Sequence, residues 1–135
     1  MSLNADTGDQ LSRLAGVLAL LERTDLEFGR WEGGDTRPDG SITMPYYELS
    51  ADGREIIATL PIVVFDWPAW KDTEEGRALL ADTARVAEAT PDQLVRLSTT
   101  LVRADRFTDG TLAWAFESGL LLAMARRARA LTELG

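Results

Sequence analysis

The sequence contains no cysteine and no histidine among its 135 residues. The lack of cysteine excludes a disulfide framework, a thiolate metal site and a cysteine nucleophile. The lack of histidine excludes a Ser-His-Asp triad and an imidazole site for zinc. Any catalysis would depend on carboxylates, arginines, tyrosines, hydroxyl groups or the single lysine, Lys71. These absences favour a protein that is not an enzyme, and we expect neither a metal ion nor a cofactor.

Long apolar runs and a basic charge balance are also missing. No run approaches the roughly 20 apolar residues that span a bilayer, and no basic, apolar and cleavable leader opens the sequence. We therefore expect a cytoplasmic protein that does not enter a membrane. The net charge is −8, and thirteen of the 22 acidic side chains lie in residues 1–72. Because this acidic half would repel nucleic acid, we do not expect nucleic-acid binding.

What the sequence does contain is a set of helical patterns in a chain of one-domain length. Hydrophobic residues make up 45% of the chain, which is enough for an ordinary core. The spacing of these residues predicts a compact, predominantly all-α domain over residues 1–135, with residues 1–6 disordered or vector-derived. Five helices joined by aromatic-rich loops are expected, at about residues 9–23, 51–60, 74–89, 91–104 and 110–133.

Helix-start signals support these boundaries. Thr90-Pro91-Asp92-Gln93 combines a threonine N-cap, proline at the first helical position and a glutamine that closes a capping box. Thr7 with Gln10 predicts a second capping box, and Thr73 is expected to open the helix at 74–89.

Residues 41–65 leave two interpretations open. In one, Ser50 is the N-cap of a helix that Pro61 ends. In the other, Asp52-Gly53 forms the turn of a small hairpin within residues 44–65, which would make the fold α+β. The preceding residues 28–40 predict a loop that holds buried aromatic side chains.

The segment Arg103-Ala104-Asp105-Arg106-Phe107-Thr108-Asp109-Gly110 leads into the longest helical pattern, which contains Gly119. A glycine inside a helix costs about 1 kcal/mol relative to alanine, so we predict a close helix contact at Gly119, within the fold or across a dimer. The predicted core is Leu14, Leu18, Ile57, Phe65, Trp67, Leu97, Leu101, Phe107, Leu112, Phe116 and Leu120.

The charged segment is also the first candidate site. Arg103 and Arg106 lie three residues apart, so two guanidinium groups beside a helix start could hold a phosphate or a carboxylate. The structural alternative is a helix corner in which Thr108 or Asp109 caps the last helix, Phe107 fills the core and the arginines pair with nearby acids.

Asp66 and several aromatic residues form the second candidate. Asp66 stands between bulky aromatic residues, where desolvation would raise its pKa towards that of a general acid. It could instead cap the turn before Pro68. Trp31 and Tyr47 could form the walls of a ligand pocket, or could belong to the core.

The order of these blocks resembles a bacterial domain family of unknown function over roughly residues 25–130. The residues that carry the resemblance are Trp31, Met44-Pro45-Tyr46-Tyr47, Phe65-Asp66-Trp67-Pro68-Ala69-Trp70 and the segment 103–110. The resemblance implies a mostly helical fold with a helix after Ser50. It implies no activity, and it suggests that the two charged aromatic blocks meet in space.

Two functional hypotheses follow. The first is a non-enzymatic protein–protein interaction module, homodimeric through the C-terminal helix. The second is a small-molecule or anion-binding domain, or an enzyme that uses carboxylates, with its site formed by Arg103, Arg106, Asp66 and Asp109 and walled by Trp31 and Tyr47. Its ligand would be a small anion.

Overall fold

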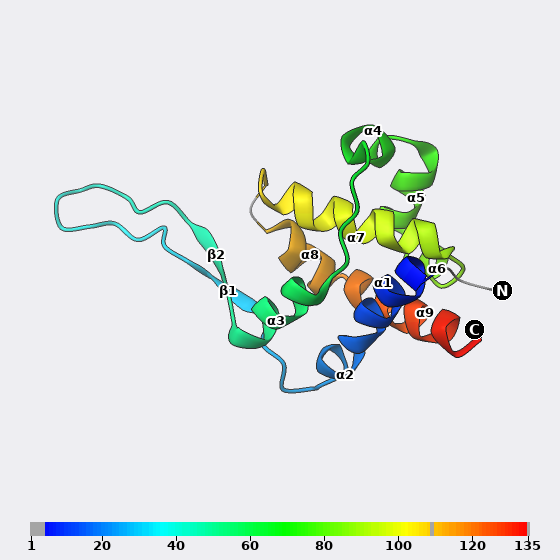
Figure 1. The fold of residues 1–135 in the computed structure, drawn as a ribbon. Coiled ribbons are helices and arrows are strands. Elements are labelled where there is room, and N and C mark those ends of the chain that lie inside the picture. Colours follow the sequence, from blue (N-terminus) through cyan, green and yellow to red (C-terminus); the bar gives the residue numbers. More distant parts are fainter. Residues whose placement is uncertain (1–4, 109, 135) are drawn as a thin grey trace.

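The computed structural model describes residues 5–108 and 110–134, which form a predominantly helical fold with one small antiparallel sheet (Figure 1). This confirms the fold class predicted from the sequence. The elements are α1 (Ala5–Gly16), α2 (Leu18–Leu21), β1 (Gly29–Glu32), β2 (Tyr46–Leu49), α3 (Ala51–Thr59), α4 (Trp67–Lys71), α5 (Glu74–Ala81), α6 (Thr83–Val86), α7 (Pro91–Asp105), α8 (Thr111–Glu117) and α9 (Leu120–Leu134).

The core is built around α9. Helix α1 packs along α9, and α2, α6, α7 and α8 also contact it. Leu121, Met124 and Ala128 of α9 are fully buried, as are Leu11 and Leu14 of α1. In the described part of the chain, no helix is long and apolar enough to cross a membrane.

Three of the predicted helices are interrupted. The helix expected at 9–23 breaks at Val17 into α1 and α2, and it begins at Ala5, so Thr7 lies inside α1 and is not its N-cap. The helix expected at 74–89 breaks at Asp82, whose carboxylate accepts a hydrogen bond from the Ala84 amide at 2.9 Å.

The helix expected at 110–133 breaks at Gly119, which has a φ of 83°. A side chain there would meet no atom within 4 Å, so the predicted close helix contact does not form within the fold, and a contact across a dimer stays a prediction. Glycine is suited to this position because the left-handed backbone between α8 and α9 costs it no steric penalty.

The other helix starts agree with the sequence signals. Ser50 Oγ accepts from the Gly53 amide at 2.9 Å and caps α3. Thr90 and Gln93 form both hydrogen bonds of the capping box at the start of α7, and Thr73 caps α5.

The helix at 51–59 confirms the interpretation in which Ser50 is an N-cap, but a hairpin is also present. It joins β1 to β2, with Trp31 opposite Tyr47, and therefore uses residues 29–32, which had been expected to form a loop. We call residues 29–49 the arm, because they project from the helical body (Figure 1).

The root of the arm is fixed at Phe28. Its ring is buried and stacks on Phe116, with centroids 4.8 Å apart. Its carbonyl oxygen accepts from the Ser50 amide at 2.9 Å. Gly53 of α3 lies so close that a Cβ atom there would be 2.1 Å from the same oxygen.

Hydrogen bonds from side chains hold the segments that lack regular structure. Ser98 Oγ of α7 donates to the Pro61 carbonyl at 2.8 Å, and Thr99 Oγ1 accepts from the Val63 amide at 2.9 Å. Glu75 accepts from Trp70 Nε1 and from Gln93 Nε2, each at 2.7 Å. These bonds attach α4 and α5 to α7.

The glycine contacts predict opposite effects for two alanine substitutions. Gly53→Ala should destabilise the protein by about 1–3 kcal/mol, because the new methyl group would overlap the Phe28 carbonyl. Gly8→Ala, in α1, should stabilise by up to about 1 kcal/mol, because nothing lies within 4 Å of the new atom. Urea unfolding measures both changes. Equal effects of the two substitutions would show that α3 does not approach Phe28 as described.

The hydrogen bonds to Glu75 predict that the stability of the protein depends on pH. The bonds from Gln93 and Trp70 lower the pKa of Glu75 below its usual 4.5. Its contribution to stability is therefore present above pH 4.5 and is lost as the pH falls through the lowered pKa. Urea unfolding should show wild type more stable than Glu75→Gln at pH 7, with the gap shrinking below pH 4.5. A gap that stays constant down to pH 3 would contradict this assignment.

Candidate functional site

Aromatic side chains gather where α7 turns into α8. Phe107 is 80% exposed and Trp114 is 45% exposed. The ring of Trp67, at the start of α4, lies 6.1 Å from that of Phe107. We call Trp67, Phe107 and Trp114 the aromatic corner. The two aromatic blocks of the sequence therefore meet, but the placement of Phe107 in the core is wrong.

A pocket of about 400 Å³ opens at the aromatic corner. Leu80, Leu101 and Ala104 add further apolar lining, and Thr111 and Lys71 add polar groups. A volume of this size falls in the range of pockets that hold ligands or anchor side chains. The pocket is the place where an apolar group from outside the chain could be buried.

The turn beneath the corner is tight because of two residues. Gly110 is the N-cap that precedes α8, and its φ of 97° is one that glycine adopts without strain. Asp105 Oδ1 accepts from the Leu112 amide at 3.1 Å and so joins the end of α7 to the first turn of α8. Thr108 does not cap α8 with its side chain. Asp109, the other predicted cap, lies outside the described residues.

Both candidate arginines lie on this turn. Arg103 is half-buried at the end of α7, and Arg106 is exposed. Within residues 5–108 and 110–134, neither forms an ion pair. Among these residues the expected pairing with nearby acids is not found, and Asp109 lies outside them. Neither arginine lines the pocket.

Asp66 has a structural role. Its carboxylate accepts from the Ala69 amide at 3.2 Å and caps α4. The residue is exposed, so it is not desolvated between aromatic rings. No described ion pair joins Asp66 to Arg103 or Arg106, so the predicted three-residue cluster is not assembled.

Trp31 and Tyr47 lie together on one face of the arm, with ring centroids 5.4 Å apart. Tyr47 is half-buried near Phe28, and its pKa is raised by burial and, less strongly, by the negative charges of Glu117 and Glu27. Neither residue lines the pocket. Trp31 is 55% exposed and lies against Gly110, so it continues the aromatic surface from the corner onto the arm.

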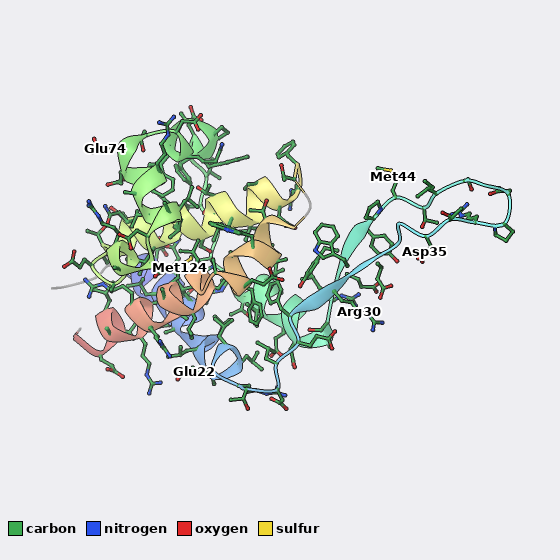
Figure 2. All side chains as sticks on the ribbon, turned by 180° about the vertical axis from the view of Figure 1, so that it is seen from behind. Glu22, Arg30, Asp35, Met44, Glu74 and Met124 are labelled. Atoms are coloured by element: carbon green, nitrogen blue, oxygen red, sulfur yellow. The ribbon has the colours of Figure 1, made fainter. Side chains whose placement is uncertain are left out.

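The arm carries a second apolar surface that sequence analysis missed. Ile42, Met44 and Tyr46 are 68%, 83% and 51% exposed. They occupy alternate positions, as in an extended segment with one apolar face. That alternation is visible in the sequence, but the two interpretations of residues 41–65, a helix after Ser50 or a hairpin turning at Asp52-Gly53, did not use it. Figure 2 shows Met44 on the arm, away from the helices.

The described residues offer no group of three acidic side chains that could hold a metal ion. The lining of the pocket is mostly apolar and aromatic, with Lys71 as the only charged residue among the described residues that form it.

The chain belongs to a family of unknown function (DUF6508), whose model matches residues 6–133. This agrees with the resemblance to a domain family without a known activity. No curated protein and no solved structure matches the chain.

The exposure of Phe107 predicts that it contributes little to stability. Phe107→Ala should change the free energy of unfolding by no more than about 0.5 kcal/mol, as at other exposed sites. Trp70→Ala should cost about 3–5 kcal/mol, because Trp70 is only 7% exposed and its indole nitrogen is bonded to Glu75. Thermal or urea unfolding tests both. A large loss of unfolding free energy in Phe107→Ala would contradict this exposure and indicate that the side chain belongs to the core.

Proposed function

We propose that this member of the family of unknown function is a protein-interaction module that acts as a homodimer. The observation that carries the proposal is the distribution of large exposed hydrophobic side chains. Of the eight in the described residues, six lie on the arm or at the aromatic corner: Trp31, Ile42, Met44, Tyr46, Phe107 and Trp114.

Such a concentration is unusual for a surface that faces only water. Single exposed apolar residues are common, but a group of them on one part of a protein is typical of a binding surface. Tryptophan, tyrosine, phenylalanine and methionine are also the residue types enriched at protein interfaces. The arm and the corner together therefore fit the burial of a macromolecular partner better than a catalytic role.

The C-terminal helix, predicted as the dimer contact, has less support. Its largest apolar residues, including Leu120, Leu121 and Met124, are buried within the chain. Gly119 makes no close helix contact. A groove of about 560 Å³ remains between α6 and α9, and Arg126 and Arg127 line it. In a symmetric dimer these like charges would face one another, and their repulsion would oppose a dimer contact at this groove.

A small apolar anion is the second candidate partner. The observation that favours it is a pair of arginines at the end of α7, Arg103 and Arg106, that form no ion pair within the described residues, although neither lines the pocket of about 400 Å³. Arginine forks bind carboxylates and phosphates well. In this alternative the corner would hold a small molecule and the chain would stay monomeric.

The oligomeric state tests the proposal. Analytical ultracentrifugation over a range of concentrations should give a species of twice the 14.8 kDa chain mass, and Phe107→Ser should weaken it. Val64→Ser is the matched control, because Val64 is fully exposed but lies outside the pocket. A chain that stays monomeric at high concentration would overturn the homodimer. A small added mass in native mass spectrometry, lost in an Arg103→Ala, Arg106→Ala variant, would favour the anion instead.

A further inference from the structure

We propose that residues 61–65 receive a β-strand from another protein. We call these residues the crossing segment, because they run from α3 to α4 and are bonded to α7 on the way (Figure 1). The ligand is an extended peptide without acidic residues, held chiefly through its main chain. This inference goes beyond the proposed homodimer and does not depend on it, because it concerns a different surface.

The sequence and α7 together hold the crossing segment in an extended form. Pro61 fixes its own φ at about −65° and disfavours a helical backbone at Leu60, whose φ and ψ are −61° and 132°. The buried hydroxyl groups of Ser98 and Thr99 bond to the Pro61 carbonyl and to the Val63 amide. A segment fixed in this way loses little conformational freedom when it binds a partner.

Backbone groups on the other side of the crossing segment are left for a partner. In an extended chain, the N–H and C=O groups of successive residues point to opposite sides. Pro61 and Val63 are bonded to α7, so the backbone groups of Ile62 and Val64 point away from it. Within the described part of the chain, the N–H and C=O groups of Ile62 and Val64 form no hydrogen bond. These two donors and two acceptors have the arrangement of a free strand edge.

The side chains alternate as they do in a strand. Ile62 is 39% exposed and Val64 is fully exposed, whereas Val63 and Phe65 are half-buried. Isoleucine and valine are branched at Cβ and favour strands. Ile62 and Val64 are also the two large exposed hydrophobic residues that lie outside the arm and the aromatic corner. A strand paired with this edge would place its own side chains beside them as cross-strand pairs.

The absence of charge distinguishes the crossing segment from the arm. Proteins commonly protect exposed strand edges against pairing by placing charged residues or proline on them. The strands of the arm carry such charges at Arg30, Glu32 and Glu48. Residues 56–65, by contrast, form the longest run without a charged side chain in the sequence. Pro61, at one end, is the only one of these protective residues in the crossing segment, so strand addition is favoured here over the arm.

The surroundings of the crossing segment indicate the class of peptide. Strand addition takes its affinity from main-chain hydrogen bonds, which do not depend on the sequence of the ligand. The exposed carboxylate of Asp66 follows the segment directly, and the chain has a net charge of −8. An acidic peptide would be repelled, and a basic residue next to Asp66 would be attracted. The ligand class is therefore an extended segment of β-branched and basic residues.

Hydrogen exchange of single amides, measured by NMR on the full chain, tests the arrangement of the free protein. The Val63 amide is bonded to Thr99 Oγ1 at 2.9 Å. It should exchange at least about tenfold more slowly than the amides of Ile62 and Val64, which have no partner within the described residues. Equal rates for the three amides would contradict the free edge and overturn the proposal.

A synthetic probe then tests the binding of a strand. The probe is a blocked peptide of alternating valine and threonine with a lysine at each end. At about 1 mM it should slow exchange at Ile62 and Val64 at least about twofold, as half-saturation requires, and leave Val63 unchanged. The same peptide N-methylated at its valines and threonines cannot donate and should have no effect. Unchanged exchange at Ile62 and Val64 with the first peptide would overturn the proposal.

Two variants at one position separate main-chain pairing from side-chain burial. Val64→Pro removes a donor that has no partner in the described chain, so the fold should survive, and circular dichroism checks this. It should weaken binding of the probe at least about fivefold. Val64→Thr keeps the donor and the branched Cβ and should bind like wild type. Equal binding by the two variants would contradict strand addition.

A second copy of the chain is the alternative occupant of the crossing segment. The amides of Ile62 and Val64 would then be protected in the free protein and would exchange faster on dilution. That result would overturn the recognition of another protein. The oligomeric state and its response to Phe107→Ser are measured separately, so this proposal and the proposed homodimer can fail independently of each other.

Discussion

The junction at Phe28 is the contact on which the arrangement of arm and body depends. The buried ring stacks on Phe116 of α8, while the carbonyl oxygen of the same residue accepts from the Ser50 amide at the start of α3. One residue thus joins a strand, a helix start and the helix that carries Trp114. Together with the contact of Trp31 against Gly110, this junction sets the position of the arm relative to the corner.

Local signals in the sequence located most helices, and contacts between distant residues decided the rest. The capping residues Ser50 and Thr90 act through atoms three positions away, so their pattern predicts the structure directly. Strand β1 depends on pairing with β2 some 17 residues later. Nothing within residues 29–32 alone requires that pairing, and so a loop was expected there.

The candidate site shows the same limit. Residue types at 103–110 indicated a charged turn next to aromatic residues, and the turn is present, with Asp105 bonded to Leu112. The sequence could not show which side of the turn faces solvent. Phe107 is exposed because Trp67 covers only part of its ring, and that geometry comes from α4, a short helix whose pattern is too brief to predict. The alternation of apolar residues in the arm is visible in the sequence, but neither interpretation of residues 41–65 used it.

The packing of α1 along α9 joins residues 5–16 to residues 120–134. This contact closes a loop of about one hundred residues, and loop closure carries an entropic cost that must be met before the contact forms. Proteins rich in such distant contacts fold more slowly than helical bundles built from neighbouring helices. The core of this helical domain therefore depends on a contact between two helices far apart in the sequence. Most of the contacts that bury α1 come from α9, so full burial of the first helix requires the last.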